Sequence, residues 1–185
     1  MEIIIKNVRL SYPTLFTAKE FKAGDGKPRW SAAFIIEPDS DNDKHIRAAI
    51  EAEAKTIWGV KSAAMLKSMA GQSNKYCYTD GNTKANEEYQ GKMVLATHRS
   101  AKLTRPVIID KDKSPLIGDT NRPYGGCYVN AKVEIYCQTG ENAGVRASFS
   151  VVQFYKDGEP FSASAPSTDG FDAIEDDGMD GDDLI

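Results

Sequence analysis

Residues 127–137 carry the strongest structural signal in the sequence, because apolar and polar side chains alternate there without interruption. Cysteine, valine, alanine and isoleucine hold the odd positions, whereas tyrosine, asparagine, lysine and glutamate hold the even ones. Successive side chains of a strand point to opposite faces of a sheet, so this period of two predicts a strand with one buried and one solvent-facing side. Residues 145–155 are its expected partner, since the turn-forming segment 141–144 separates the two.

Further apolar runs predict additional strands before this hairpin. They lie at 3–10, 30–36, 93–99 and 107–110. Ser11-Tyr12-Pro13 is expected to end the first of them, because proline and the residue before it are restricted in their backbone angles. The Gly-rich stretch 22–28 is expected to be a loop or hairpin tip.

A helical block is expected between the second and third strands. Apolar side chains recur at helical spacing over 42–58, directly after Ser40 and Asp41, whose side chains are suited to cap a first helical turn. A shorter helix is expected at about 61–69, and residues 72–91 are expected to form a long, mobile loop with room for a short strand. The predicted fold class is therefore mainly β with a helical insertion.

The charge of the chain is divided unequally along its length. Of the 27 acidic side chains, eight fall within residues 166–185, which contain no lysine or arginine. The preceding part of the chain consequently carries four more basic than acidic side chains, although the net charge of the whole is −4. We expect a folded domain over 1–165 that binds a polyanion, followed by a disordered acidic tail over 166–185. The alternative is a tail that only improves solubility.

Aromatic and basic side chains share the solvent-facing side of the 127–137 strand, where Tyr128, Lys132 and Tyr136 hold even positions. Aromatic rings stack on bases of any identity, at about 1–3 kcal/mol each, and lysine neutralises phosphates. The alternative for each tyrosine is packing against a neighbouring loop or helix. The same combination recurs near predicted strand ends and loops, which extends the candidate nucleic-acid-binding set to Arg9, Tyr12, Lys27, Arg29, Trp30, Arg99, Lys102 and Tyr124. A strand tryptophan such as Trp30 is equally compatible with the core.

The sequence contains no recognisable catalytic or cofactor motif, so we expect a protein that is not an enzyme and needs no cofactor or metal. Phosphate-binding Gly-Lys-Ser/Thr and Gly-x-Ser-x-Gly motifs are absent, and the calcium-loop-like segment 39–50 has Lys44 and Ile50 where glycine and glutamate are required. The three cysteines lack metal-binding spacing and are expected to be reduced, buried residues. The sequence has neither a signal peptide nor a long apolar segment, which predicts a cytoplasmic protein without membrane contact.

Several segments resemble a family of phage-encoded single-stranded-DNA-binding proteins, formerly a domain of unknown function. Residues 7–16, Asn-Val-Arg-Leu-Ser-Tyr-Pro-Thr-Leu-Phe, are similar to the opening of that family. So are 124–131, Tyr-Gly-Gly-Cys-Tyr-Val-Asn-Ala, and the stretch from Gly144-Val145 through 152–159. The resemblance covers residues 1 to about 165. It implies an OB-fold-like, five-stranded antiparallel barrel that coats single-stranded DNA in phage DNA replication, recombination or repair, with duplex DNA as a further ligand.

The tail is similar in kind to the acidic tails of bacterial and phage single-strand binders, although it lacks their common terminal phenylalanine. This resemblance implies that the tail recruits replication or recombination proteins, and we also expect it to compete for the DNA groove when DNA is absent. The candidate partner-binding residues are Asp176, Asp177, Asp180, Asp182, Asp183, Leu184 and Ile185. Homo-oligomers or cooperative assembly on DNA remain open.

Two other functions fit the sequence less well. A phage inhibitor would use the acidic tail as a DNA mimic to occupy a host protein, and its domain would not bind DNA. A metal-dependent nuclease would use scattered carboxylates such as Asp110, Asp112 and Asp119, although their spacing does not require such a site.

Overall fold

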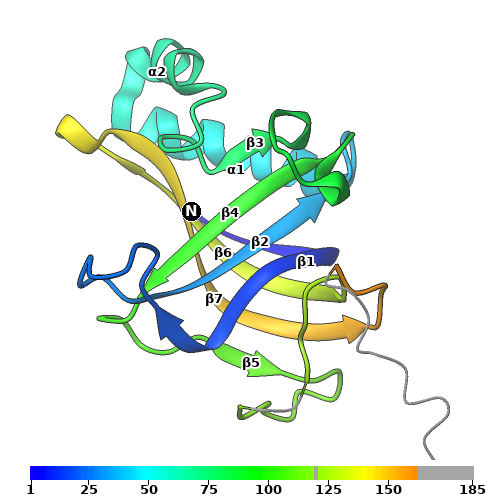
Figure 1. Cartoon of the computed structure of the whole chain (residues 1–185). Coiled ribbons are helices and arrows are strands. Elements are labelled where there is room, and N and C mark those ends of the chain that lie inside the picture. The colour runs from blue at the N-terminus through cyan, green and yellow to red at the C-terminus, as the bar shows by residue number, and fades with distance from the viewer. Residues whose placement is uncertain (119–120, 162–185) are drawn as a thin grey trace, which may run out of the picture.

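A single sheet of seven strands, in the order β3-β4-β2-β1-β6-β7-β5, forms the body of the protein (Figure 1). The computed structural model describes residues 1–118 and 121–161, so the predicted tail lies outside the described residues. The five long strands are antiparallel: β1 (Glu2–Lys19), β2 (Arg29–Ile36), β4 (Met93–Ser100), β6 (Tyr128–Gln138) and β7 (Gly144–Lys156). The predicted fold class, mainly β with a helical insertion, is confirmed.

Two short strands extend this five-stranded set. β3 (Tyr78–Asp80) pairs antiparallel with β4, and β5 (Val107–Ile109) pairs parallel with residues 151–153 of β7. The residues before β3 also bond to β7, since Val145 N–H donates to the Lys75 carbonyl at 2.8 Å and Cys77 N–H donates to the Val145 carbonyl at 3.0 Å. Segment 75–80 therefore joins β4 to β7 and closes the sheet into a barrel.

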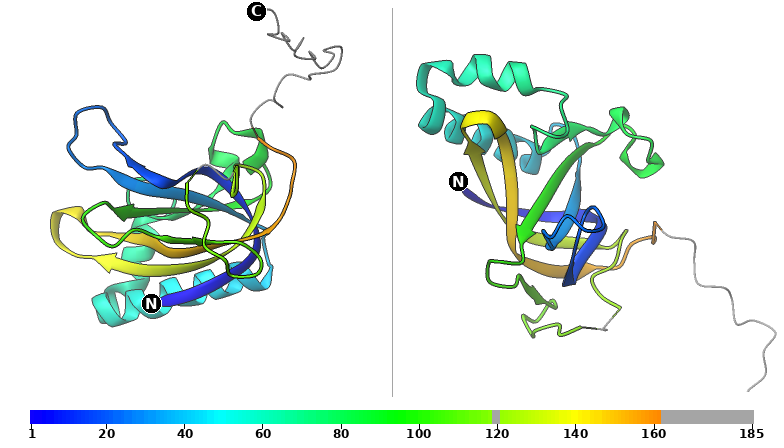
Figure 2. Two further views of the ribbon diagram at one scale, coloured as in Figure 1. Left: turned by 90° about the horizontal axis from the view of Figure 1, so that it is seen from below. Right: turned by 60° about the vertical axis from the view of Figure 1, so that its left-hand side comes forward.

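The predicted helical block is present as α1 (Asp41–Trp58), the 3-10 turn η1 (Gly59–Lys61) and α2 (Ser62–Met69). The Ser40 side chain caps α1 by accepting from Asp43 N–H at 3.2 Å. Ile46, Ala49 and Ile50 join the main core cluster of the barrel (Figure 2). The apolar face of α1 therefore covers one end of the barrel and its hydrophobic core.

β1 is longer than predicted, because the chain passes through Pro13 and continues to Lys19. The pairing of β1 with β2 shifts register between Ser11 and Thr14, and Tyr12 has a positive φ of 45°. A bulge of this kind tolerates proline, since the missing N–H falls where ladder bonds are already interrupted. The prediction that Ser11-Tyr12-Pro13 ends the strand is wrong.

The segment 72–91 is more ordered than a mobile loop. It contains β3 and the 3-10 turns η2 (Gly81–Thr83) and η3 (Glu87–Tyr89), with Tyr78 and Tyr89 buried. The Tyr78 hydroxyl donates to buried Asp43 at 2.6 Å, and this hydrogen bond holds the segment against α1. The remaining short turn, η4 (Gly140–Asn142), joins β6 to β7.

Candidate nucleic-acid interface

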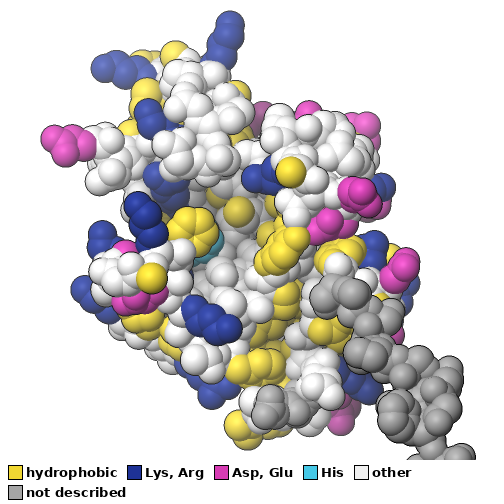
Figure 3. Space-filling model, in the orientation of Figure 1, with side chains coloured by type: hydrophobic (Ala, Val, Ile, Leu, Met, Phe, Trp, Pro, Cys, Tyr) yellow, Lys and Arg dark blue, Asp and Glu magenta, His cyan; other side chains and the backbone are white. Residues whose placement is uncertain are grey.

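A groove of about 770 Å³ opens between two hairpins that project from the same side of the barrel. The β1–β2 hairpin contributes Phe21, Lys27 and Arg29, and the β6–β7 hairpin contributes Tyr136 and Arg146 among others. Figure 2 shows both hairpins at the same end of the barrel, and Figure 3 shows the surface hollowed beside them, with basic and hydrophobic side chains around the hollow. The base of the groove comes from β4, through Ala96 and His98.

The described residues that line the groove include three cationic side chains and no carboxylate. Lys27 is exposed, and Arg29 lies 3.6 Å from Asp25 in a partly exposed ion pair. Arg146 donates to the Asn74 carbonyl at 2.6 Å and to the Gln138 side chain at 3.2 Å, so its guanidinium is held in place. A concave, positively charged surface of this kind attracts a polyanion.

Rings lie among these charges. Phe21 is 80% exposed, an unusual position for phenylalanine, and the Arg29 guanidinium lies over its ring at 5.0 Å. Tyr136 borders the groove from β6. The loss of water around His98, together with the positive charges of Arg29 and Arg146, lowers the pKa of the His98 imidazole. His98 therefore presents a neutral ring near pH 7.

Small side chains of β1, β2 and β4 lie on the same face of the sheet as Ala96 and His98, and we call this surface the floor. Residues directly opposite one another across an antiparallel pair lie on the same face, which places Thr14, Ser31 and His98 in one row and Ala33 beside Ala96 in the next. The Thr14 and Ser31 hydroxyls hydrogen-bond to each other at 2.6 Å.

Two tyrosines stand beyond the floor. Tyr12 is 62% exposed and meets buried Tyr89 edge to face, with ring centroids 6.5 Å apart. The Tyr89 hydroxyl hydrogen-bonds to Ser11 at 2.9 Å, so the tyrosine pair is fixed to β1. The floor thus runs between rings at both ends.

Of the side chains predicted from the sequence, Lys27, Arg29 and Tyr136 line this groove and Tyr12 lies past its floor. Trp30 does not, because it is only 8% exposed and belongs to the core cluster. Arg99 pairs with Trp30 across β2 and β4 and therefore shares its face rather than that of His98. Its Nε donates to the Thr104 carbonyl at 2.6 Å.

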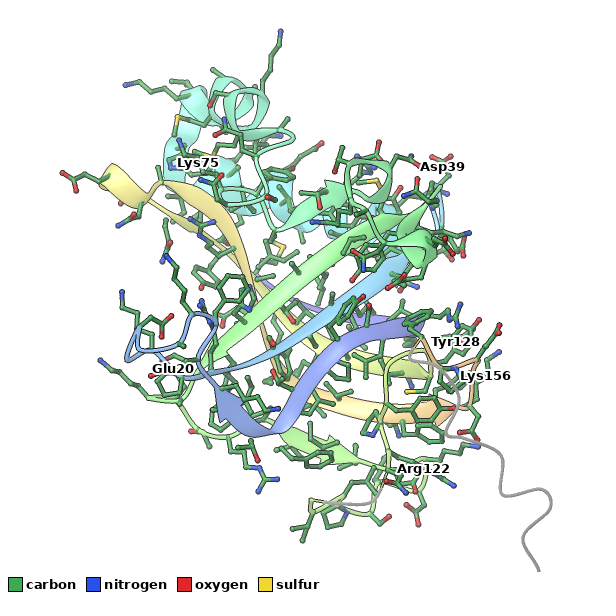
Figure 4. The ribbon with its side chains drawn as sticks, viewed as in Figure 1. Glu20, Asp39, Lys75, Arg122, Tyr128 and Lys156 are labelled. Atoms are coloured by element: carbon green, nitrogen blue, oxygen red, sulfur yellow. The ribbon has the colours of Figure 1, made fainter. Side chains whose placement is uncertain are left out.

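Three further predicted residues lie together at the opposite side of the barrel, where β7 ends: Arg9, Tyr124 and Tyr128. Figure 4 shows Tyr128 beside Lys156 there, away from Glu20 and Lys75. The Lys156 ammonium lies 4.5 Å and the Arg9 guanidinium 5.8 Å from the centroid of the Tyr128 ring. Arg9 also donates to the Glu159 carbonyl at 2.7 Å. These contacts fasten the segment after β7 to β1.

Tyr124 also holds the segment after β7, since its hydroxyl lies 3.0 Å from a carboxylate oxygen of Asp157 and 3.0 Å from the Gly158 carbonyl. Lys132 forms an ion pair with Glu2 at 2.7 Å, and Lys102 is exposed in the turn that follows β4. The structure therefore divides the predicted set between the groove and its floor, the core, the exit of β7, and separate positions for Arg99, Lys102 and Lys132.

Phe21, His98 and Arg146 line the groove but are absent from the predicted set. A large apolar residue inside an otherwise polar, Gly-rich hairpin tip was a usable signal for Phe21. Nothing in the local pattern separates Arg146 from other strand arginines, because its place in the groove depends on how the β6–β7 hairpin meets the loop before β3.

Residues 1–118 and 121–161 contain no group of three potential metal ligands. No helix in the described ranges is long and apolar enough to cross a membrane. All three cysteines are free, with Cys77 and Cys127 buried and Cys137 half-buried. Burial raises the pKa of the Cys127 thiol to about 11.

A family model and a related phage protein both match almost the whole chain. The family model of the Enterobacter phage Enc34 ssDNA-binding protein matches residues 1–184. A putative protein p50 of Acyrthosiphon pisum secondary endosymbiont phage 1 is 36% identical over 178 residues, which cover 94% of each chain.

Solved structures of phage proteins also match this chain. The bacteriophage Enc34 single-stranded DNA-binding protein in complex with ssDNA matches with a TM-score of 0.71 and 25% identity, over 87% of this chain and 89% of that one. Gp2.5, a single-stranded DNA-binding protein encoded by bacteriophage T7, shares the fold at 10% identity, with a TM-score of 0.62 over 90% of this chain and 97% of that one. The match along almost the whole sequence shows that this chain belongs to the family of the phage Enc34 single-stranded-DNA-binding protein.

Proposed function

We propose that this protein binds single-stranded DNA without sequence preference and coats it during phage DNA replication, recombination or repair in the host cytoplasm. The observation that carries the proposal is the groove between the β1–β2 and β6–β7 hairpins, whose described lining combines three cations with exposed rings and has no carboxylate. Phosphates would lie against Lys27, Arg29 and Arg146, and bases would stack on rings such as Phe21 and Tyr136.

The floor supports sequence tolerance. Ala33 and Ala96 have no hydrogen-bonding side chain, and the hydroxyls of Thr14 and Ser31 are engaged with each other at 2.6 Å. Direct readout of a base requires donors and acceptors at fixed positions. A floor of this composition gives bases a surface to lie on and few groups that favour one base over another.

The acidic tail is proposed to compete with DNA for this groove and, when released, to recruit replication or recombination proteins. Phe161, the last described residue, packs against Ile35, Tyr89 and Val94 on the outer face of β2 and β4, beside the floor. The described part of the chain therefore ends beside the floor, and the eight carboxylates of the tail are opposite in sign to the cations of the groove, as DNA phosphates are. Asp182, Asp183, Leu184 and Ile185 are proposed to form its partner-binding end.

Fluorescence anisotropy of labelled oligo(dT), titrated with the full chain and with residues 1–165 at two salt concentrations, tests both parts. We expect salt-sensitive binding by each form and tighter binding by the truncated one. Equal affinities at low salt would contradict competition by the tail. Absence of binding by both forms would refute the DNA-binding proposal and favour a tail that occupies a protein partner. Duplex DNA in parallel titrations tests the further ligand.

A groove-filling variant locates the site. Ala96→Phe places a large side chain on the floor, and we expect it to weaken oligo(dT) binding at least tenfold. Ala48→Phe on the exposed face of α1 is the matched control and should bind as the natural protein does. Equal binding by both variants would mean that DNA does not follow the floor.

A further inference from the structure

Phe161 lies at the end of the floor and is held there by three contacts. It packs against the cluster of Ile35, Tyr89 and Val94, which Ala33 of the floor also contacts. Its backbone N–H donates to the Gly125 carbonyl at 3.1 Å. The Arg9 guanidinium lies over the ring at 4.3 Å and donates to the neighbouring Glu159 carbonyl at 2.7 Å.

The backbone around this residue leaves little freedom to move. A Cβ added at Gly126 would lie 2.1 Å from the Glu159 carbonyl oxygen, and one added at Gly158 would lie 2.3 Å from the Gly126 carbonyl oxygen. The two segments are therefore in direct backbone contact, which fixes the position of the chain just before Phe161. The ring itself remains half-buried, so part of it faces solvent beside the floor.

We propose that Phe161 is a base-stacking residue that ends the DNA path over β1, β2 and β4, and that Arg9 is the positioning residue that holds its ring. The inference rests on the proposed function. A fixed, partly exposed ring favours stacking because no side-chain freedom is lost when a base meets it. The Arg9 cation over the ring would also attract DNA phosphates at this end.

At the exit of β7, the Arg9 guanidinium donates its hydrogen bonds to backbone carbonyls. Its Nε donates to the Gly126 carbonyl at 3.2 Å, so one guanidinium bonds to both sides of the backbone contact and also lies over one face of the ring. Lysine cannot reproduce this, because it lacks the planar fork of donors. The residue acts on DNA through Phe161.

Two substitutions at the same position test the proposal in the full chain. Phe161→Leu keeps apolar packing but removes the ring, and we expect the Kd for oligo(dT) to rise about tenfold with little change in melting temperature. Phe161→Trp keeps a ring and adds a reporter, so its fluorescence should be quenched when oligo(dT) binds. Val60→Trp on η1, where the natural side chain is fully exposed, is the matched reporter and should not be quenched.

The role of Arg9 has its own readout. Arg9→Lys should weaken oligo(dT) binding by itself and add nothing further when combined with Phe161→Leu, because both changes remove one stacking site. A purely structural role for Arg9 would instead give additive losses and a lower melting temperature.

The outcomes separate the two proposals. If the natural protein binds oligo(dT) but Phe161→Leu binds as well or more tightly, and Phe161→Trp is not quenched, Phe161 is no stacking residue and the groove assignment stands. If the natural protein does not bind oligo(dT) even at low salt, the proposed function fails and this inference fails with it.

Discussion

The charge of the groove leads to a quantitative prediction for Lys27. For single strands, the logarithm of the binding constant falls with the logarithm of salt concentration by about 0.7 for each phosphate neutralised. Three groove cations, Lys27, Arg29 and Arg146, thus predict a slope of about −2.1 and a loss of roughly 18-fold in affinity between 50 and 200 mM salt. Each cation alone accounts for about 2.6-fold.

Lys27 is the best position for the substitution, because Arg29 and Arg146 also make contacts within the protein. Its side chain is exposed and forms no ion pair with another described residue. Lys27→Gln should reduce the slope from about −2.1 to about −1.4 and leave the melting temperature unchanged. The assay is anisotropy of labelled oligo(dT) at four or more salt concentrations.

The matched control is Lys44→Gln, which removes one exposed lysine from the first turn of α1. It lowers the net charge of the protein by the same amount but lies outside the groove lining, so its slope should equal that of the natural protein. Equal slopes for all three proteins would mean that Lys27 contacts no phosphate. Equal reductions in both variants would mean that overall charge, and not the groove, sets the salt dependence.

Two further predictions concern pH and the exit of β7. The positive charges of Arg29 and Arg146 contribute to the lowered pKa of His98, and phosphates in the groove would oppose them, so the His98 pKa should rise on DNA binding. A group whose pKa rises on binding takes up a proton, so oligo(dT) affinity should increase as pH falls from about 7.5 to 6; an NMR titration in which the His98 pKa is the same with and without DNA would contradict this. Gly126→Ala should destabilise the domain by about 3 kcal/mol in thermal unfolding, since φ is +107° and the new Cβ would lie 2.1 Å from the Glu159 oxygen. Gly140→Ala, at φ +77° with no atom within 4 Å, should lower the stability by only about 1 kcal/mol. Equal losses of stability in the two variants would show that the backbone contact at Gly126 is not the cause.

The secondary structure was predictable where local patterns decide it. The alternation over 127–137 and the cap at Ser40 identified β6 and α1, because side-chain period and capping act within a few residues. The extension of β1 past Pro13 was not predictable in this way. It depends on a bulge whose existence is set by the pairing of β1 with β2.

The groove was predictable only in part, for a related reason. Period-two alternation separates the inside of a barrel from its outside, which is why Tyr128, Lys132 and Tyr136 were all placed on an outer face. It does not show which part of that face is concave. The barrel carries Tyr136 to the groove and Tyr128 to the exit of β7, although both lie on one strand.

Trp30 and Phe21 show the same limit from opposite directions. Both are aromatic residues in the β1–β2 hairpin region, yet Trp30 is 8% exposed and Phe21 is 80% exposed. Apolar character favours burial, so the buried tryptophan needs no function to explain it. An exposed phenylalanine under the Arg29 guanidinium buries little apolar area, and its place in a groove lined by cations suits a ligand with both charge and flat apolar faces. Nucleic acid is the polyanion that offers both, which is why the exposed ring supports the DNA-binding proposal more strongly than the number of basic residues does.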